Sequence, residues 1–468
     1  MSPTASPPPS RSRMFATKRA LARAIGGLSR LSGRGGGTTL PGRVLLHAAP
    51  DAISRLSSRL EHGSTVVSAT NGKTTTASMI AAAMSADGRH PVHNKAGSNM
   101  AWGVATALLE GDGEEGLFEV DEAWLPEVCE ALEPRLLVLG NLFRDQLDRY
   151  GELEHLAEEW SELIARLEGR CRFVLCADDP LIADLGRDGD RVREGVSYFG
   201  IDDSTYALAE LQHAHDAKHC RRCGAPYDYS YVLVGHLGHY SCPNCGARRP
   251  EPEVAATAVE LDGIAGSRFS IRTPEGSTPF ELPIPVLYNV YNATAAIAAA
   301  RAHEISVEVT REAVAGLEAV FGRVETIKVE GRQISILLVK NPAGANEVLR
   351  TIKLEAGEGT PLQLWLALND RIADGRDVSW IWDADFELLT EVVGEVTCAG
   401  TRAAEMALRL KYAGWPEQRI EVIEDIPKSL ERARERASGR LFALPTYTAL
   451  IELRTMLADA GHAGEFWR

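Results

Sequence analysis

The most informative stretch of this chain reads Thr65-Val66-Val67-Ser68-Ala69-Thr70-Asn71-Gly72-Lys73-Thr74-Thr75-Thr76. Its apolar start predicts a β-strand, and the Ala-Ser-Met-Ile run that follows it predicts a helix. A tight loop between the two places backbone N–H groups and the positive end of the helix where they can bind phosphate. Lys73 adds a positive charge, and the Thr74 hydroxyl can bind Mg²⁺. The sequence therefore predicts an ATP-binding loop formed by Thr70, Asn71, Gly72, Lys73, Thr74 and Thr75.

One position of this loop departs from the general phosphate-loop pattern. That pattern has a glycine six residues before the lysine, and Val67 stands there in this chain. The alternative interpretation is an accidental strand, turn and helix with a solvated lysine. The Gly-Lys-Thr triplet lies at the junction between the predicted strand and helix, and this position favours the binding loop.

Length and composition indicate a globular protein with more than one domain. The chain has 468 residues, too many for one hydrophobic core, and 45% of them are hydrophobic. The net charge of −15 argues against a general nucleic-acid-binding surface. No apolar stretch is long enough to span a bilayer, and cysteines scattered in apolar segments are typical of a reducing compartment. We therefore expect a cytoplasmic protein.

The N-terminal region is basic. Residues 1–15 are rich in Pro, Ser and Arg and are expected to form a disordered tail. Residues 18–34 are basic and partly amphipathic through Leu21, Ile25, Leu28 and Leu31. We expect a helix that docks on the body of the protein, and a weak contact with a membrane surface is the alternative.

Strands and helices alternate in both halves of the chain, which indicates two doubly wound α/β units with parallel sheets. In the first half, strands are predicted at 65–69, 116–120, 136–141, 172–176 and 195–198. Across both halves, helices are predicted at 151–167, 293–303, 401–413 and 426–437. In the second half, strands are predicted at 334–339, 362–368, 395–399 and 440–444. We predict a tail, an ATP-binding domain and a Rossmann-like domain at 1–15, 16–322 and 323–468.

Four cysteines form a metal-site pattern. Cys220-Arg-Arg-Cys223 and Cys242-Pro-Asn-Cys245 are two CxxC pairs, each followed by Gly. Each pair can form a tight turn that points two thiolates at one centre, and two such turns make a tetrahedral Cys₄ site. Since sulfur fills all four positions, the metal, zinc in preference to another thiolate-bound metal, is expected to be structural and to hold together an insertion at about 216–250. A redox dithiol is the alternative, but it does not require two matched pairs.

Acidic residues follow the predicted strand at 116–120. Glu119, Asp121 and Glu122 lie at its carboxyl end, the edge where ligands bind in doubly wound sheets. Carboxylate oxygens are hard ligands that suit Mg²⁺. A solvated acidic loop is the alternative interpretation of this segment taken alone.

Several of these segments resemble the Mur ligases and the folylpolyglutamate synthetases, which join an amine to a carboxylate. The Thr-Asn-Gly-Lys-Thr-Thr run is similar to their ATP loop, although Ala69 stands where they usually have Gly. Further resembling segments follow in family order at 139–151, 288–296 and 322–325. The resemblance implies a magnesium ligand, an adenine contact and a phosphate contact at Glu122, Asn292 and Arg323. Gln146 stands where the family has a metal-binding His.

The predicted Rossmann-like domain has an acidic stretch after its strand at 362–368. Five aspartates fall within residues 370–385, which also contain Trp380 and Trp382. We expect both tryptophans to be buried and to hold Asp383 as a fixed carboxylate, in preference to a solvated turn.

A narrower resemblance, to the MurT synthetase subunits of lipid II isoglutaminyl synthase, rests on this stretch and on 340–346, 447–450 and 33–42. It implies that ATP phosphorylates the α-carboxylate of the D-glutamate in the lipid II stem peptide. Ammonia then displaces phosphate and leaves D-isoglutamine. The resemblance also implies that a glutaminase partner, GatD, supplies the ammonia, and that the protein works at the inner face of the membrane.

The same resemblance implies roles for single residues. Lys73 and Mg²⁺ would neutralise charge on the transferred phosphoryl group. No cysteine here has a convincing nucleophile setting with a histidine, so glutamine hydrolysis is expected from another chain. Asp383, with Asp377 as the second choice, would guide ammonia or complete the Cys–His pair of that partner.

Three other function classes compete with this interpretation. A folylpolyglutamate-type or Mur-type amino acid ligase shares the ATP loop, but offers no reason for a zinc ribbon. A nucleic-acid-binding protein that uses the ribbon is disfavoured by the net charge of −15. A catalytically idle scaffold would keep the fold and lose Lys73.

Overall fold

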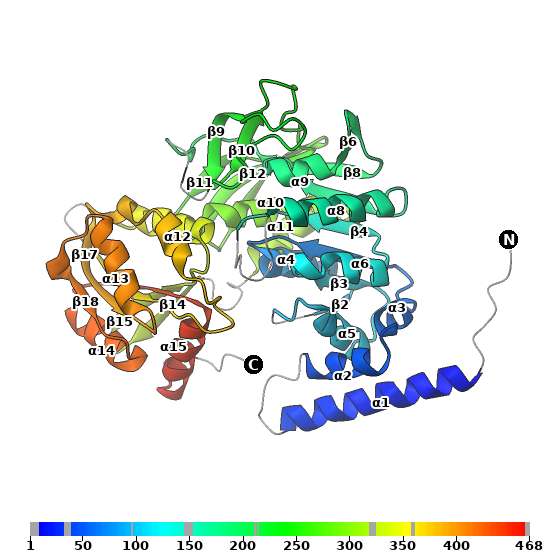
Figure 1. The fold of residues 1–468 in the computed structure, drawn as a ribbon, viewed down its shortest axis with the longest axis horizontal. Helices are drawn as coiled ribbons and strands as arrows, with labels where there is room; N and C mark the ends of the chain where they lie inside the picture. The colour runs from blue at the N-terminus through cyan, green and yellow to red at the C-terminus, as the bar shows by residue number, and fades with distance from the viewer. Residues whose placement is uncertain are drawn as a thin grey trace.

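The computed structural model describes residues 9–31, 39–94, 97–144, 153–209, 212, 215–317, 324–356 and 361–463. Figure 1 shows two α/β parts side by side, with the C-terminal part coloured from yellow to red. Each part is built around a sheet of its own, one of nine strands and one of six. The described chain therefore has the two α/β units that its alternating pattern predicts.

The larger sheet carries the predicted ATP loop. Its strand order is β13-β12-β11-β8-β5-β4-β1-β3-β2. Strand β1 (Ser64–Ser68) pairs in parallel with β3 (Gly116–Glu119) and with β4 (Leu136–Leu139), and every residue of these three strands is buried. The other strands are β2 (Val92–His93), β5 (Arg172–Cys176), β8 (Val196–Ile201), β11 (Val254–Leu261), β12 (Ser267–Thr273) and β13 (Gly276–Leu282).

Two groups of helices pack around this sheet. One group contains α4 (Lys73–Ala86), α10 (Leu287–Ala302) and α11 (Val307–Ala315). The other contains α2 (Leu40–Ala48), α3 (Ala52–Ser57), α5 (Ala101–Glu110), α6 (Leu125–Leu132), α8 (Leu153–Leu167) and α9 (Pro180–Leu185). Because β1, β3 and β4 run parallel, the segments that follow them meet at one edge of the sheet.

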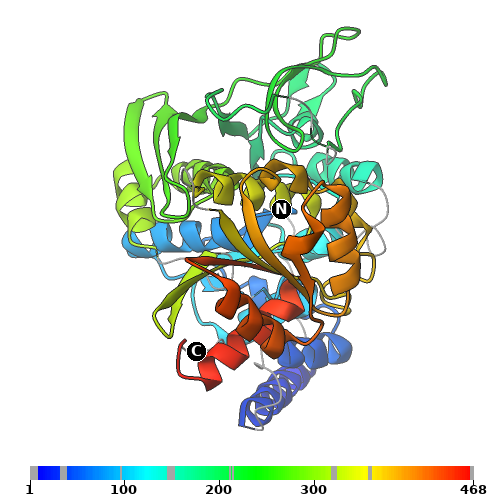
Figure 2. The same cartoon turned by 90° about the vertical axis from the view of Figure 1, so that its left-hand side faces the viewer.

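A cysteine-containing insertion lies between β8 and β11. Its hairpin consists of β9 (Asp228–Val234) and β10 (Leu237–Ser241), which pair antiparallel. In Figure 2, where the C-terminal part faces the viewer, this insertion lies at the top of the molecule, at the opposite end from the N-terminal helix. We call residues 215–250 the ribbon.

The smaller sheet has two cores, one on each face. Its order is β14-β15-β19-β16-β17-β18, and all neighbours are parallel except β14 and β15. Along β16 (Leu362–Ala367), Leu364 and Leu366 belong to one core, whereas Trp365 and Ala367 belong to the other. This alternation follows from the two-residue period of a strand.

The remaining C-terminal elements cover these two cores. Helices α12 (Pro342–Leu354) and α13 (Ala403–Tyr412) contribute to the first core, and α14 (Ile426–Arg436) and α15 (Tyr447–Asp459) to the second. The other strands are β14 (Val324–Val329), β15 (Arg332–Leu337), β17 (Val393–Ala399), β18 (Ile420–Val422) and β19 (Leu441–Pro445).

The predicted fold class is confirmed, and every predicted strand is present, most with shifted ends. The sheets also have strands that were not predicted, among them the edge strands β2, β14 and β18. Strand β4 ends at Leu139, whereas 136–141 was expected, because the next two residues turn toward the ATP loop. Helix α10 begins at Leu287, before the Ala-rich run that marked it in the sequence. Strand β15 begins at Arg332, because its hairpin with β14 extends the pairing to that residue. The predicted domain boundary at 322–323 lies outside the described residues.

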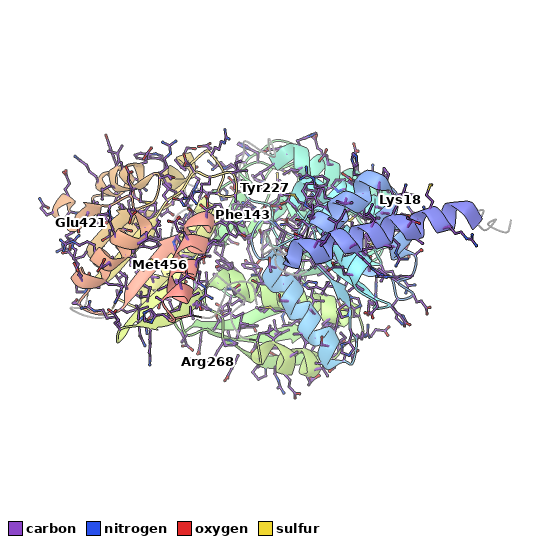
Figure 3. The ribbon with its side chains drawn as sticks, turned by 90° about the horizontal axis from the view of Figure 1, so that it is seen from below. Lys18, Phe143, Tyr227, Arg268, Glu421 and Met456 are labelled. Carbon is purple, nitrogen blue, oxygen red and sulfur yellow. The ribbon has the colours of Figure 1, made fainter. Side chains whose placement is uncertain are left out.

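The N-terminal helix differs from expectation in its start and in its packing face. Helix α1 (Pro9–Leu31) begins inside the predicted tail, and Phe15 and Ala22 are buried. Leu21 and Leu28, expected on the docking face, are 57% and 67% exposed. The helix does dock on the body, against α2 and α5, but through the face that carries Phe15, Ala22 and Gly26. Figure 3 shows it from below, along the outside of the molecule with Lys18 labelled.

None of the described helices is both long enough and apolar enough to cross a bilayer.

Candidate functional site

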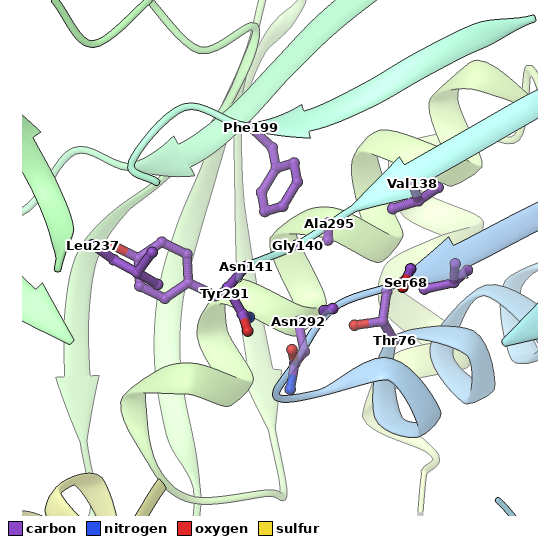
Figure 4. Close-up of a pocket in the computed structure, with 12 residues that line it drawn as sticks. Ser68, Thr76, Val138, Gly140, Asn141, Phe199, Leu237, Tyr291, Asn292 and Ala295 are labelled. Atoms are coloured by element: carbon purple, nitrogen blue, oxygen red, sulfur yellow. The ribbon is translucent and has the colours of Figure 1, made fainter. Parts of the chain in front are cut away.

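The loop between β1 and α4 has the conformation that a phosphate-binding loop requires. Gly72 has a φ of 97°, a left-handed value that glycine adopts without steric cost. A Cβ atom at Gly72 would lie 1.9 Å from the Asn292 amide oxygen, so only glycine permits this approach. The side chain of Asn292 on α10 lies against the loop, as Figure 4 shows. Two predicted nucleotide contacts thus meet.

Asn141, just beyond β4, holds the loop from the neighbouring strand. Its side chain accepts a hydrogen bond from the Asn71 N–H and donates one to the Asn71 carbonyl oxygen, both at 2.9 Å. The Thr70 N–H donates to the Asn141 carbonyl oxygen at 2.9 Å, and the Thr70 hydroxyl accepts from the Phe143 N–H at 3.0 Å. Thr70 therefore fixes the shape of the loop. Asn141 was not predicted as a site residue, although it lies at the end of a strand and in the segment 139–151 that resembles the Mur ligases.

Lys73 begins α4, and its ammonium group is buried among acceptors. The Nζ atom lies 2.6 Å from the Ala69 carbonyl oxygen and 2.6 Å from Glu122 Oε2. Only 8% of Lys73 and 4% of Glu122 are exposed. Lys73 of the loop and Glu122, the predicted magnesium ligand, therefore form one buried ion pair.

The charges around Glu122 keep its carboxylate ionised. Burial by itself raises the pKa of this carboxyl group, but the ammonium groups of Lys73 and Lys340 outweigh burial and lower the pKa below the ordinary glutamate value. An ionised carboxylate is a hard oxygen ligand. Together with the half-buried hydroxyl of Thr74 at the start of α4, this donor set fits Mg²⁺ bound beside a phosphate. The neighbouring Thr75 is buried.

A small cavity lies beside the loop, next to α10. Its wall is mostly apolar and aromatic and includes Ala69, Gly140, Phe199, Leu237, Tyr291 and Asn292 (Figure 4). The Tyr291 hydroxyl donates to Asp178 at 2.7 Å, which fixes its ring. The cavity has a volume of about 10 Å³, room for about one water molecule, so it lies beside the loop and does not itself enclose a nucleotide base.

The C-terminal sheet brings further polar groups to the loop. Asn341 caps α12 by accepting from the Gly344 N–H at 2.9 Å, and its amide donates to Asn71 Oδ1 at 3.0 Å. Lys340 lies close enough to Glu122 to affect its pKa. Neither Asn341 nor Lys340 was predicted as a site residue. Asn71 and Asn341 are 270 positions apart, and only the fold brings them together.

The aspartates of residues 370–385 differ in their partners. Four bind groups of their own sheet: Asp370 with Arg402, Asp374 with Thr448, Asp377 with Ser379 and Asp385 with Asn346. The Asp383 carboxylate instead lies 3.5 Å from the guanidinium of Arg144, which follows β4 in the larger sheet. Arg144 also pairs with Asp216 in the ribbon. Asp383 thus stands at the junction between the two sheets.

Asp377, the second catalytic candidate, has the geometry of a turn residue. It accepts a hydrogen bond from the Ser379 N–H at 2.8 Å. Hydrogen bonds from Ser379 lower the pKa of its carboxyl group. This arrangement is an Asx turn at the surface, and no residue of the ATP loop contributes to it.

The expectation that two buried tryptophans hold Asp383 in place is wrong. Trp382 is 46% exposed and Trp380 is half-buried, whereas Ile381 is 1% exposed. The segment is a short 3₁₀ helix, η2 (Ser379–Asp383), and its three-residue turn leaves about one residue in three on the buried side. Ile381 and Ala384 occupy that side, so the tryptophans do not enclose the carboxylate.

The four predicted cysteine ligands come together in the ribbon. Their sulfur atoms all lie within 4.8 Å of one another, with Cys220 and Cys245 at 3.6 Å and Cys223 and Cys242 at 3.4 Å. A tetrahedral zinc with Zn–S bonds of about 2.3 Å needs sulfur separations of about 3.8 Å. The donor set therefore fits a structural zinc ion.

The backbone around the cysteines supports the same conclusion. In the first pair the Gly224 N–H donates to the Cys220 carbonyl oxygen at 2.8 Å, and in the second the Gly246 N–H donates to the Cys242 carbonyl oxygen at 3.0 Å. Both glycines have positive φ, 73° and 76°, which allows each tight turn. Two matching turns face each other, as metal binding by paired CxxC motifs requires.

The tip of the ribbon hairpin reaches the candidate site. Leu237 lines the cavity beside Asn292. The neighbouring His236 is completely buried, and its Nε2 lies 3.2 Å from Asp179. Asp179 also accepts from the Leu142 N–H at 2.9 Å. The ribbon therefore contacts the segment after β4 that supports the loop.

Two expected features lie outside the described residues. Arg323, the predicted phosphate contact, falls in 318–323, and Gln146 falls in 145–152.

Two family models match this chain. The Mur ligase middle domain matches residues 67–247, and the MurT ligase C-terminal domain matches residues 338–450. A pseudomurein peptide ligase type C from Methanothermus fervidus has a similar structure, with a TM-score of 0.67, 21% identity and coverage of 87% of this chain and 80% of that one. The MurF ligase from Thermotoga maritima in complex with ADP has a TM-score of 0.61, 15% identity and coverage of 87% and 82%. Both likenesses show the Mur ligase fold.

Relatives of higher identity match nearly the whole chain. The MurT subunit of the glutamine-hydrolysing lipid II isoglutaminyl synthase from Streptococcus pneumoniae is 33% identical over 92% of this chain and 94% of its own length. The MurT subunit from Staphylococcus aureus strain N315 is 30% identical over 92% and 94%. Since the match runs through both sheets and covers nearly all of each relative, the chain belongs to the family of MurT subunits of lipid II isoglutaminyl synthase.

Proposed function

We propose that this chain is the ATP-dependent synthetase subunit that converts the D-glutamate α-carboxylate of the lipid II stem peptide into an amide. The observation that carries the proposal is its 33% identity, over 92% of its length, to a MurT subunit of lipid II isoglutaminyl synthase. The buried pair of Lys73 and Glu122 at the loop supports ATP-dependent chemistry.

The reaction needs an activated carboxylate, because carboxylate oxygen is a poor leaving group. A carboxylate oxygen of the substrate attacks the γ-phosphorus of ATP, and the bond between that phosphorus and the ADP oxygen breaks. Ammonia then attacks the carbonyl carbon of the acyl phosphate. The bond between carbon and the phosphate oxygen breaks, a proton leaves nitrogen, and an amide, ADP and phosphate are the products.

The residues at the loop suit the first step. The Lys73 ammonium, oriented by the Ala69 carbonyl and Glu122, places a fixed positive charge where phosphoryl oxygens gain negative charge. Thr74 and Glu122 would hold Mg²⁺, which supplies further positive charge when bound. Asn292, which lies against Gly72 of the loop, would contact the adenine ring, and Arg323 would contact the phosphates.

Ammonia would come from a glutaminase subunit, GatD. Outside the ribbon, all four free cysteines of the chain are buried, and burial raises the pKa of Cys171 and of Cys398 to about 12. Burial also raises the pKa of the Cys129 and Cys176 thiols. A thiol must ionise to attack glutamine, so these four are unsuited to glutamine hydrolysis. Asp383 would guide ammonia or complete the Cys–His pair of the partner.

Amidation of lipid II by the reconstituted enzyme tests the proposal. The full chain is incubated with the glutaminase subunit, glutamine, ATP, Mg²⁺ and lipid II. Mass spectrometry should detect the exchange of one hydroxyl for an amino group, together with one ADP for each amide. ADP formation that requires an amino acid acceptor and no ammonia source would instead identify an amino acid ligase.

A further inference from the structure

Helix α1 is attached to the body by one narrow face. Phe15 and Ala22 are buried, and the Arg55 guanidinium lies 3.9 Å above the Phe15 ring. At Gly26 a Cβ atom would lie 2.6 Å from Pro41 of α2, so a small residue is needed where the two helices cross. This face accounts for the docking of the helix and leaves its other side uncovered.

The uncovered side of α1 is apolar. Met14, Leu21 and Leu28 are 57%, 57% and 67% exposed, and their spacing of seven residues puts them in one stripe along the helix. The other exposed residues between them are Ala16, Thr17, Ala20, Arg23 and Ala24. A helix of a soluble protein normally turns charged and polar residues toward water. Here six of the eight exposed residues between positions 14 and 28 are apolar, and the exceptions are Thr17 and Arg23.

The charge of α1 is opposite to that of the whole protein. Residues 9–31 contain six arginines and lysines and no aspartate or glutamate, whereas the net charge of the chain is −15. Lys18 and Arg23 donate to the carbonyl oxygens of Ala48 and Leu109. These acceptors are neutral, so the contacts anchor the helix without cancelling its charge.

We propose that the exposed face of α1 binds the surface of a bilayer that contains anionic lipids. The stripe of Met14, Leu21 and Leu28 enters the boundary between headgroups and acyl chains, and the positive charge of α1 attracts anionic headgroups, as in other interfacial helices. A second copy of this chain fits less well, because two copies of α1 would bring like charges together. The helix lies parallel to the membrane, because its apolar stripe runs along its length.

Sedimentation with vesicles tests this surface in the full-length protein. The protein should sediment with vesicles of phosphatidylcholine mixed with phosphatidylglycerol, and much less with phosphatidylcholine alone. Added salt should weaken binding, because it screens the basic residues. The variant Leu21→Glu/Leu28→Glu should lower the bound fraction about tenfold or more, because it places two charges in the apolar stripe.

A matched control is Leu354→Glu, which changes a leucine that is 51% exposed at the end of α12. Its vesicle binding should equal that of the unmodified protein. The thermal midpoint of Leu21→Glu/Leu28→Glu should also be unchanged, because neither leucine packs in a core.

Three outcomes would overturn the proposal. They are equal binding to both kinds of vesicle, unchanged binding of the double variant, and a dimer in light scattering that the double variant converts to a monomer. The assay uses neither ATP nor an acceptor, so its failure would leave the proposed reaction untouched.

Discussion

Lys73 and Glu122 can stay together in a buried site because each compensates the charge of the other. Removing one charge from a buried pair leaves the other without a partner, which costs about 3–5 kcal/mol. Stability and catalysis are therefore linked at this pair, and a single substitution does not separate them. A variant that removes both charges does.

We predict that Lys73→Met/Glu122→Gln folds with nearly normal stability and forms ADP at least about 10³-fold more slowly. The neutral pair leaves no buried charge, but it also leaves no ammonium group to stabilise the transferred phosphoryl group. ADP release and urea unfolding are the measurements. Lys73→Ala alone should lose both activity and stability. An active double variant would exclude Lys73 as the phosphate ligand.

The same pair predicts how stability depends on pH. The folded-state pKa of Glu122 is lower than its ordinary value. The stabilisation that the ionised Glu122 carboxylate provides is therefore complete above the ordinary glutamate pKa. It is lost as the pH falls through the folded-state pKa. Lys73→Met/Glu122→Gln lacks this carboxylate, so the variant, nearly as stable as the unmodified protein at neutral pH, should become the more stable of the two on acidification. Urea titrations over a descending pH series measure both unfolding free energies, and a difference that stays constant would contradict the assignment.

Substitutions of Asp383, at the junction of the two sheets, and of Asp377, in a surface turn, should affect amidation differently. Asp383→Asn should lower glutamine-dependent amidation by about 10²-fold or more, as expected for a group that orients a catalytic base. Asp377→Asn, which alters only a surface turn, should leave it nearly unchanged. Assays with glutamine and with ammonium salts as nitrogen source separate the two proposed roles. If only the glutamine-dependent rate falls, Asp383 completes the partner's pair, and if both rates fall, it guides ammonia.

At the scale of the elements, the ribbon contacts the region beside the ATP loop as well as holding the four cysteines. Its hairpin places Leu237 in the wall of the cavity beside Asn292 and His236 against Asp179. A motif that the sequence marks as structural therefore also shapes the candidate nucleotide site. Removing the metal should affect nucleotide binding through the position of this hairpin.

We predict that Cys223→Ser lowers the zinc content and raises the KM for ATP about tenfold. Loss of the apolar contact from Leu237 corresponds to about 1.4 kcal/mol, which is one factor of ten in affinity. Metal analysis, limited proteolysis of the ribbon and ATP titration are the measurements. Cys398→Ser, a buried cysteine of the other sheet, is the control for zinc content. An unchanged KM with the zinc lost would limit the ribbon to a structural role.

The ends of the predicted strands show which local signals are sufficient. Strand β5 has the bounds that its apolar run predicts, residues 172–176. Strand β4 is shorter because Asn141 leaves the ladder to bind the loop. Apolar runs mark what is buried, but they do not distinguish a strand residue from a buried polar support beside it.

At the scale of the whole molecule, the two sheets meet through the ribbon as well as at the loop. Arg350 on α12 donates to the carbonyl oxygens of Leu233 and Tyr206, at 2.7 Å and 2.6 Å. Its guanidinium also pairs with Glu347 at 2.6 Å. Burial raises the pKa of the Glu347 carboxyl group, despite the opposing effect of Arg350. Arg350 therefore connects the C-terminal sheet to the ribbon and to the segment after β8.

We predict that Arg350→Ala lowers the unfolding free energy by about 2 kcal/mol, because two carbonyl oxygens lose their hydrogen-bond donor. The rate of amidation should also fall, because the contact between the two parts of the molecule is weakened. In the background Glu347→Gln, where no buried carboxylate loses its partner, the stability loss should be smaller. Small-angle scattering should show a more extended particle. A scattering curve and a rate equal to those of the unmodified protein would exclude this contact as a link between the parts.

Features that depend on neighbouring residues follow from the sequence alone. The strand, loop and helix at 65–76, the paired CxxC turns and the α/β alternation are of this kind, because turn geometry and periodicity act over a few residues. The Asn71–Asn341 and Asp383–Arg144 contacts and the exposed stripe of α1 are of another kind. They depend on how distant segments pack, since tertiary contacts determine which face of a helix is covered and which polar groups share a site. Local sequence patterns do not specify how distant segments pack.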